Sequence, residues 1–178
     1  YAEMRGVAAL RQQIAKKIEL QHGRKVDADD EITITSGATQ AIYAILTALL
    51  RENDEVIIFE PAYDSYVPSI QLSGAKPIYI KLKAPDYKIP WDAVKRVMNT
   101  RTKMIIINSP HNPTGTMLTA DDIDQLHRIV RGSNIFVLSD EVYEHIVFDN
   151  NHHYSMLMHP ELYNRSICTF SFGKTFHT

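Results

Sequence analysis

Residues 104–115, Met-Ile-Ile-Ile-Asn-Ser-Pro-His-Asn-Pro-Thr-Gly, join an unbroken apolar run to a polar turn. Three consecutive isoleucines closed by Asn, Ser and Pro predict a short strand over 104–107. Apolar runs without alternation are typical of parallel sheets that are covered on both faces. The Asn-Pro and Thr-Gly pairs then predict a tight turn. Polar side chains are therefore expected at the carboxyl end of a buried strand.

The same alternation of strand and helix signals extends over the rest of the chain. The expected strands are residues 31–35, 55–59, 76–82, 104–107, 135–138 and 166–170. The expected helices are residues 10–21, 38–50, 63–73, 91–98 and 119–131, the last one capped by Thr119. This order predicts an α/β fold with three α-β-α layers around a mostly parallel sheet, in one domain spanning 1–178.

Composition excludes several classes of protein. The chain has 178 residues, of which 44% are hydrophobic and 22% charged, as in ordinary globular proteins. Its 19 basic and 21 acidic residues give a net charge of −2, which argues against a nucleic-acid or membrane-surface partner. The single cysteine, Cys168, allows no internal disulfide and no cysteine-based metal site. With no long apolar stretch and no signal peptide, a cytoplasmic location is expected.

The ends of the sequence suggest a piece of a longer protein. The chain starts at Tyr1 instead of a methionine and stops at Thr178, shortly after Lys174. We therefore expect an N-terminal segment and a C-terminal small domain to be absent from this sequence.

The segment Ser36-Gly37-Ala38-Thr39-Gln40 joins an expected strand to an expected helix. Small residues at a helix N-terminus let backbone N–H groups approach an anion such as a phosphate. The alternative is a plain helix cap by Ser36 or Thr39. The dinucleotide pattern G-x-G-x-x-G does not occur, and a nucleotide P-loop at Gly173-Lys174-Thr175 fails because Cys168 stands where that motif needs glycine.

Three further residues follow expected strands. Asn112 would project an amide above the sheet, or belong to a plain turn. Asp140 comes just after an apolar strand, where a carboxylate is costly to bury without a cation such as a protonated pyridine nitrogen; Glu141 is expected to be a solvated acid at a helix start. Lys174, beside Gly173, could lose solvent at a strand end and become a nucleophile.

Two histidines and a second tyrosine are not taken as functional residues. His152 and His153 are expected in an exposed loop, and no metal site is predicted there. Tyr63 and Tyr66 could both face a ligand, but only Tyr63 belongs to a motif.

Taken in order, five motifs resemble the fold-type I, class I and II, pyridoxal-phosphate-dependent aminotransferases, and they span essentially the whole chain. The resemblance is greatest to the methionine and kynurenine/glutamine transaminase branch. The motifs are Ser36-Gly37-Ala38-Thr39, Pro61-Ala62-Tyr63, Asn112-Pro113-Thr114-Gly115, Asp140-Glu141-Val142-Tyr143 and Ser171-Phe172-Gly173-Lys174.

The resemblance implies a role for each matching residue, with pyridoxal 5′-phosphate as cofactor. Lys174 would hold the cofactor as a Schiff base and later move the substrate proton, and Asp140 would pair with the pyridine nitrogen. The other implied contacts are Asn112 and Tyr143 on the phenolic oxygen, Tyr63 on the ring face, Gly37, Ala38, Thr39 and Ser171 on the phosphate, and Tyr1 on the phosphate of a partner subunit in a homodimer.

The function implied is transfer of an amino group from a methionine-like or aromatic L-amino acid to a 2-oxo acid. Two alternatives stay open: a C–S lyase that cleaves cystathionine-like substrates on the same scaffold, and a non-catalytic regulator domain. Because further phosphate- and carboxylate-binding residues of the family would follow Thr178, residues 1–178 alone are expected to be inactive or nearly so.

Overall fold

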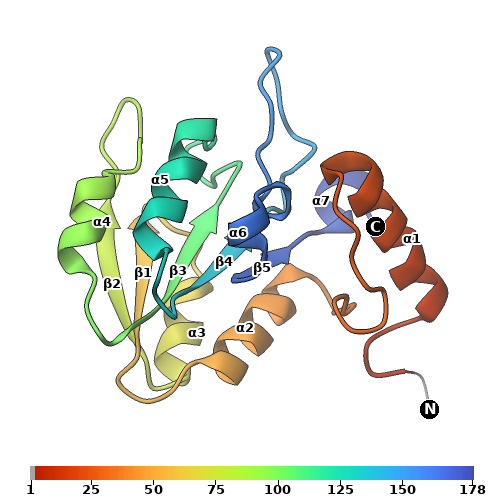
Figure 1. Ribbon diagram of the computed structural model, residues 1–178, viewed down its shortest axis with the longest axis horizontal. Coiled ribbons are helices and arrows are strands. Elements are labelled where there is room, and N and C mark those ends of the chain that lie inside the picture. Colours follow the sequence, from red (N-terminus) through yellow and green to blue (C-terminus); the bar gives the residue numbers. More distant parts are fainter. Residues whose placement is uncertain (1–2) are drawn as a thin grey trace.

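The computed structural model describes residues 3–178 and contains one five-stranded sheet in the order β2-β1-β3-β4-β5 (Figure 1). All neighbouring strands are parallel. The strands are β1 (Glu55–Glu60), β2 (Lys76–Lys81), β3 (Thr102–Asn108), β4 (Phe136–Asp140) and β5 (Ser166–Thr169).

Helices connect these strands and cover the sheet. They are α1 (Ala8–His22), α2 (Ala38–Leu49), α3 (Tyr66–Leu72), α4 (Trp91–Val97), α5 (Ala120–Val130), the 3-10 turn η1 (Met156–Met158), α6 (Pro160–Tyr163) and α7 (Phe172–Phe176). Thr119 caps α5 as predicted, because its hydroxyl accepts from the Asp122 N–H while the Asp122 carboxylate accepts from the Thr119 N–H.

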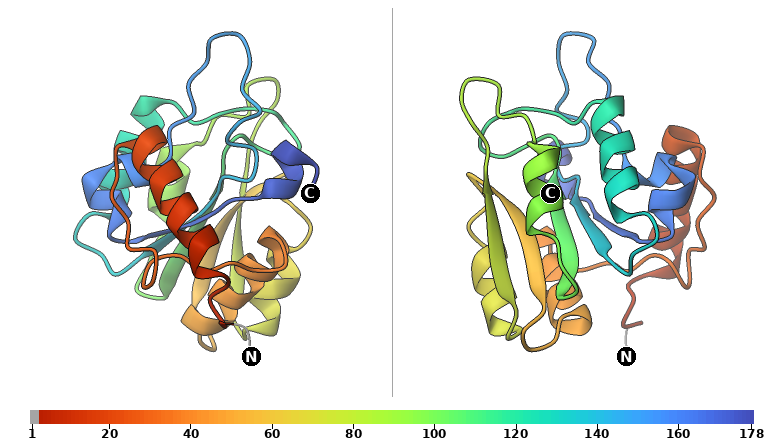
Figure 2. Two further views of the ribbon diagram at one scale, coloured as in Figure 1. Left: turned by 90° about the vertical axis from the view of Figure 1, so that its right-hand side faces the viewer. Right: turned by 60° about the vertical axis from the view of Figure 1, so that its left-hand side comes forward.

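Alternate residues of the inner strands β1, β3 and β4 enter two separate cores. On β3, Met104 and Ile106 pack with α2 and α3, whereas Ile105 and Ile107 pack with α4 and α5. This alternation follows from the two-residue period of a strand. The views in Figure 2 show the helices on both sides of the sheet. The three-layer α/β fold predicted from the sequence is confirmed.

Two of the expected elements differ from the prediction by more than two residues. Residues 31–35 form no strand, although Ile34 donates its N–H to the carbonyl of Arg5 at 2.9 Å. A β-rich segment becomes a strand only when a neighbour pairs with it, and within residues 3–178 none does so. Helix α3 begins at Tyr66 and not at residue 63, which leaves Tyr63 in the loop after β1.

The strand register brings three polar residues together at the carboxyl edge of the sheet. Asn108 is paired with Asp140 across β3 and β4, and Asp140 with Thr169 across β4 and β5. In open α/β sheets this edge is where ligands bind. The fold thus places the polar ends of β3, β4 and β5 where a site is expected.

Two features lie beside this edge. The loop 142–155, between β4 and η1, rises above the rest of the molecule (Figures 1 and 2). Helix α1 packs beside β5, where Ile18 shares a cluster with Cys168 and Phe170 and the Lys17 ammonium is 5.4 Å from the ring centre of Phe170. None of the helices in the described part of the chain is both long and apolar enough to cross a membrane.

Candidate active site

A small cavity of about 120 Å³ opens at the carboxyl ends of β3 and β4. Residues from distant motifs of the sequence share it. Its lining consists of Ala38, Thr39, Ile42, Tyr63, Asn108, Asn112, Asp140, Val142, Tyr143, Ser171 and Lys174. We call it the Lys174 cavity. It contains eight of the site residues expected from the sequence; Gly37 lies next to it, and Tyr1 lies outside the described residues.

Asp140 is the buried acid of this cavity. Only 4% of its surface is exposed, and its carboxylate accepts hydrogen bonds from the Tyr66 hydroxyl, from Thr169 Oγ1 at 3.3 Å and from the Val142 N–H at 3.4 Å. Burial raises the pKa of Asp140 above its ordinary value, although the hydrogen bond from Tyr66 acts in the opposite direction. A cation beside this carboxylate would therefore be strongly favoured.

Tyr66, which the sequence analysis considered but left without a role, contacts the acid of the site. Its ring is 3% exposed in the core between α2 and α3, and its hydroxyl meets Asp140. Burial and the neighbouring carboxylate raise the pKa of the Tyr66 hydroxyl far above its usual range, so that it remains a donor. Tyr63 packs edge-on against it, with ring centres 5.7 Å apart.

Lys174 reaches the cavity from the short helix α7. Its ammonium nitrogen lies 5.6 Å from the ring centre of Tyr143, and Ser171 lines the cavity immediately before α7. The expectation that Lys174 loses solvent is wrong for this structure, since the residue is exposed. The amine faces a common cleft with Asp140, which is the arrangement that the resemblance requires.

Two asparagines connect β3 to β4. Asn108 donates from Nδ2 to the carbonyl of Asp140 at 2.9 Å, and its Oδ1 accepts the N–H of Asn112 at 2.8 Å. The turn that carries Asn112 is thereby held over the end of β4. Asn108 was not singled out from the sequence, although its place at the end of the apolar run 104–107 was a usable signal.

The N-terminus of α2 forms the third side of the cavity. Gly37 precedes the helix with φ 85° and ψ 166°, a conformation that is open almost only to glycine. A Cβ atom built on Gly37 would meet nothing within 4 Å, so open space lies beside the free N–H groups of α2. No side chain caps this helix, which excludes the alternative of a plain cap by Ser36 or Thr39. Thr39 Oγ1 lies 3.4 Å from the Tyr63 hydroxyl.

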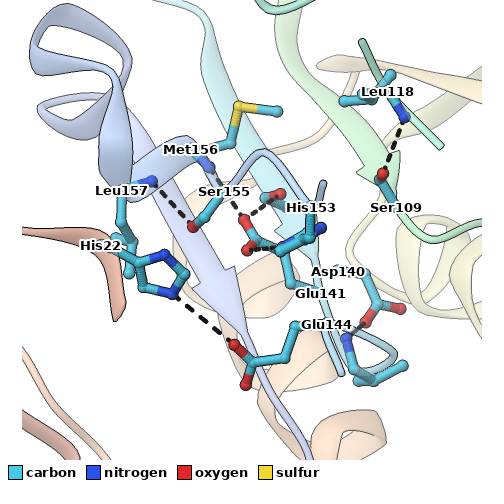
Figure 3. Close-up of polar contacts among 12 residues, drawn as sticks. His22, Ser109, Leu118, Asp140, Glu141, Glu144, His153, Ser155, Met156 and Leu157 are labelled. Carbon is cyan, nitrogen blue, oxygen red and sulfur yellow. Dashed lines mark hydrogen bonds and ion pairs between the residues drawn. The ribbon is translucent and has the colours of Figure 1, made fainter. Parts of the chain in front are cut away.

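The acid next to Asp140 behaves differently from the prediction. Glu141 is 1% exposed and not a solvated acid, because its carboxylate lies 2.8 Å from Nε2 of His153, which is itself buried (Figure 3). The expectation of an exposed His153 is therefore wrong as well. Within residues 3–178, no group of three or more His, Cys, Asp or Glu residues could hold a metal ion.

A second, larger cavity of about 490 Å³ lies beside the ends of β1 and β3. Its walls include Phe59, Tyr87, His111 and Leu118, and burial lowers the pKa of the His111 ring. Lys174 and Asp140 are not among its walls. Size alone would select this cavity, but most of the site residues expected from the sequence line the smaller one.

Known proteins resemble this chain over nearly all of its length. The profile of the family "Aminotransferase class I and II" matches residues 1–177. The methionine aminotransferase of Escherichia coli is 48% identical over 177 residues, which are 99% of this chain and 46% of that protein. A kynurenine–oxoglutarate transaminase of Saccharomyces cerevisiae, described as probable, is 32% identical over 99% of this chain and 42% of its own.

Solved structures agree with these sequence matches. The crystal structure of YbdL from Escherichia coli, for which a methionine aminotransferase function was identified, superposes with a TM-score of 0.98 at 47% identity, over 99% of this chain and 47% of that one. An aromatic aminotransferase from Pyrococcus horikoshii gives a TM-score of 0.95 at 36% identity, over 100% of this chain and 48% of that one. The chain spans about half the length of the curated relatives that it matches.

The ordered motifs, the three-layer fold and the shared Lys174 cavity thus agree with the comparisons. The chain belongs to the class I and II aminotransferases.

Proposed function

We propose that the full-length protein is a pyridoxal-phosphate-dependent aminotransferase that moves the amino group of a methionine-like or aromatic L-amino acid to a 2-oxo acid. One observation carries the proposal: Lys174, Asp140 and Asn112, from three separate motifs, line a single cavity at the carboxyl edge of the sheet. The methionine and kynurenine enzymes among the relatives support the proposed substrate class.

The residues present fit this cofactor, group by group. The open space beside Gly37 and the free N–H groups of α2 suit a phosphate. The buried carboxylate of Asp140 suits a protonated pyridine nitrogen, because such a cation would relieve the cost of burying the charge. Asn112 and Tyr143 supply donors for the phenolic oxygen, and the Tyr63 ring lies where it could stack on the cofactor.

Bound pyridoxal phosphate supplies an electron sink for the charge that develops on the substrate α-carbon. Lys174 would bind the aldehyde carbon of the cofactor and, once released by the substrate amine, carry the proton between the α-carbon and the cofactor. Its exposure on α7 leaves the side-chain nitrogen accessible for both tasks, which the unprotonated amine would perform. Ser171, at the start of α7, would add a hydroxyl donor to the phosphate.

Asp140 would hold the proton on the pyridine nitrogen. For this it must stay ionised in a buried place, and the hydrogen bond from the Tyr66 hydroxyl favours its ionised form. Thr169 Oγ1 and the Val142 N–H donate to the other carboxylate oxygen. The site thus orients the carboxylate before the cofactor arrives.

Five earlier expectations enter the proposal with the function. We propose that residues 1–178 are the cofactor-binding part of the enzyme, that the remaining part supplies the groups binding the substrate carboxylate, and that residues 1–178 alone are inactive or nearly so. We also propose a homodimer, in which Tyr1 contacts the phosphate of the partner subunit, and a cytoplasmic location, in line with the single cysteine. Sedimentation of the full-length protein tests the dimer.

The decisive experiment uses the full-length protein with pyridoxal phosphate. We expect an absorption band of the lysine-bound cofactor, which disappears in Lys174→Ala and persists in the control Lys83→Ala, at an exposed lysine outside the cavity. Spectra recorded with a panel of amino acids should show conversion of the cofactor by methionine or aromatic amino acids. An intact band in Lys174→Ala, or release of pyruvate and ammonia from cystathionine as the main reaction, would contradict the proposal.

A further inference from the structure

Glu141 directly follows Asp140 but turns to the other face of the sheet. Successive strand residues point to opposite sides. Asp140 faces Tyr66 and lines the Lys174 cavity, whereas Glu141 contacts Met156, which belongs to the core beneath α4 and α5. Figure 3 shows the two carboxylates apart, with that of Glu141 turned toward His153 and Met156. Glu141 therefore cannot touch a ligand in the cavity directly.

Both carboxylate oxygens of Glu141 are occupied. Oε1 accepts from the Ser139 hydroxyl at 2.8 Å and from the Met156 N–H at 3.1 Å, and Oε2 lies 2.8 Å from Nε2 of His153. With 1% exposure, this acid has exchanged its water for three protein donors. A buried acid of this kind is costly to bring out of water, so its retention next to the site needs an explanation.

The contacts of Glu141 join the two ends of the loop 142–155. The loop leaves the sheet after Glu141 and returns at His153 and Met156, both of which contact the Glu141 carboxylate. Between these ends the loop rises from the body of the molecule, and Phe148 on it is 69% exposed (Figures 1 and 2). The contacts of Glu141 with His153 and Met156 therefore fix the conformation of the loop where it leaves the sheet.

Tyr143 stands at the start of this loop. The N–H of Glu144 donates to the carbonyl of Glu141 at 2.9 Å, which closes a turn around Tyr143. On the other side, the N–H of Glu141 donates to the carbonyl of Thr169 at 2.9 Å. Glu141 is thus fixed by backbone and side chain at the point from which both Asp140 and Tyr143 enter the cavity.

We propose that Glu141 is a positioning residue for Tyr143 and Asp140, and that His153 is the side chain through which it ties the loop 142–155. The proposal rests on the proposed function for its effect on the cofactor, but the loop tie itself does not depend on it. Nδ1 of His153 is buried without a partner among residues 3–178. A ring protonated on Nε2 directs its N–H at the carboxylate and leaves Nδ1 as a bare acceptor.

This arrangement defines informative substitutions. Glu141→Gln replaces one carboxylate oxygen by an NH2 group. In either orientation of the amide, this group meets another donor, the Nε2–H of His153 or the N–H of Met156. His153→Leu removes the donor. His153→Gln keeps an N–H donor near the Nε2 position and serves as the conservative control. Ile123→Val, in the core under α5, is the control for a general loss of stability.

The first test uses the full-length protein without cofactor. Hydrogen exchange at the amides of Glu144 and Met156 should become about tenfold faster in Glu141→Gln and His153→Leu, because local opening exposes these donors. It should stay near the wild-type rate in His153→Gln and in Ile123→Val. Equal exchange in all four variants would overturn the loop tie. If Glu141→Gln does not fold, His153→Leu and His153→Gln decide this test on their own.

The second test loads the same variants with pyridoxal phosphate. The pH midpoint of the absorption change of the bound cofactor reports the contact of Tyr143 with the phenolic oxygen. In Glu141→Gln the midpoint should shift by about half a pH unit, in the same direction as the shift that Tyr143→Phe causes. In the conservative control His153→Gln the midpoint should stay at the wild-type value. In the Tyr143→Phe background, Glu141→Gln should add no further shift.

The outcomes separate the two proposals. An unchanged midpoint in Glu141→Gln, or the same shift with and without Tyr143, would overturn the positioning role. A wild-type protein without any band of bound cofactor would instead overturn the proposed function, and the exchange result would then decide the loop tie alone. A midpoint shift in Ile123→Val as large as that in Glu141→Gln would overturn the specific role of Glu141.

Discussion

The Tyr66 hydroxyl donates a hydrogen bond to the Asp140 carboxylate, and this contact joins helix α3 to the carboxyl end of β4. Both groups are buried, so the bond forms away from competing water. It makes α3 more than a cover for the sheet, because the helix helps to set the ionisation and the direction of the acid in the Lys174 cavity.

Replacement of Tyr66 by phenylalanine removes this donor and retains the ring. The pKa of Asp140, already raised by burial, should rise further, and the acid should hold a pyridine proton less well. We expect kcat/KM of the full-length enzyme to fall about 10- to 100-fold, since a hydrogen bond to a charged group is worth about 1.5–3 kcal/mol. Tyr79→Phe, at an exposed position of β2, is the control. Equal kinetics of the two variants would contradict the role of Tyr66.

Asp140→Asn should raise the stability of the cofactor-free protein and abolish the activity of the enzyme. Burial raises the pKa of Asp140 in the folded chain, so the stability linked to this group is complete below the unfolded pKa of 3.8 and is lost as the pH rises through the folded pKa. At pH 8 the cofactor-free variant should therefore be more stable than the wild type, by about 1 kcal/mol, while activity is lost. Denaturant unfolding between pH 4 and pH 8 measures this difference.

The gain in stability should shrink as the pH falls toward the unfolded pKa of 3.8, because protonation of the wild-type acid removes the cost of burying its charge. Asp124→Asn, at an exposed position on α5, should leave both stability and activity near the wild-type values. A less stable Asp140→Asn variant at pH 8 would show that the hydrogen bonds from Tyr66 and Thr169 outweigh the cost of burying the charge.

Gly37→Ala should impair phosphate binding more than folding. The positive φ of Gly37 makes any side chain strained, at a cost of about 1–3 kcal/mol. The new methyl group would also enter the open space beside α2 where we place the phosphate. We expect the dissociation constant of pyridoxal phosphate, measured by fluorescence, to rise about 100-fold, because about 2.7 kcal/mol of binding would be lost.

Gly132→Ala is the control for strain. Gly132 also has a positive φ, of 73°, and a Cβ atom there would meet nothing within 4 Å, but the residue follows α5 and lies outside the Lys174 cavity. It should lose stability without losing cofactor affinity. A similar loss of affinity in both variants would remove the support for a phosphate at Gly37.

Lys17→Met should weaken the attachment of α1 to the loop 142–155. Glu144 on this loop has Lys17 within ion-pair distance at 2.5 Å and His22 at 3.8 Å. Burial opposes its charge, but the neighbouring His22 and Lys17 side chains outweigh burial and lower its pKa. The stability linked to Glu144 is therefore present above the unfolded pKa of 4.5 and is lost as the pH falls through the lower, folded pKa.

Unfolding free energies at pH 7 should fall by about 1–2 kcal/mol in Lys17→Met, and the gap to the wild type should close as the solution becomes acidic. The neighbouring Lys16 is exposed and forms no ion pair within residues 3–178, so Lys16→Met is the matched control. A gap that stays constant down to pH 3 would show that Lys17 stabilises α1 by packing over Phe170 alone.

Much of this fold could be predicted because its signals are local. The run 104–107 is apolar enough to require cover on both faces, and β3 forms there with Met104 and Ile105 in different cores. Asp140 could be found for the same reason: a carboxylate at the end of such a strand needs a partner. Lys174 could be found only together with the other motifs, since an exposed lysine has no distinguishing local pattern.

The parts that sequence could not provide depend on pairing between distant residues. Tyr66 has the spacing of a core residue on α3, and nothing nearby indicates a partner 74 positions away at Asp140. From sequence alone Glu141 is predicted to be a surface acid. It is buried because the loop 142–155 folds back and places His153 against its carboxylate. The segment 31–35 has a strand composition but lacks a neighbour within the described chain, and composition cannot supply one.

The layer formed by α4 and α5 contributes no residue to the Lys174 cavity among residues 3–178. That side of the molecule is therefore suitable for attaching a label. A dye, an affinity label or a solid support attached at the solvent-facing Asp124 would lie across the sheet from Lys174. Immobilised in this way, the enzyme would present its reactive edge outward, ready for use as a sensor surface or a flow catalyst.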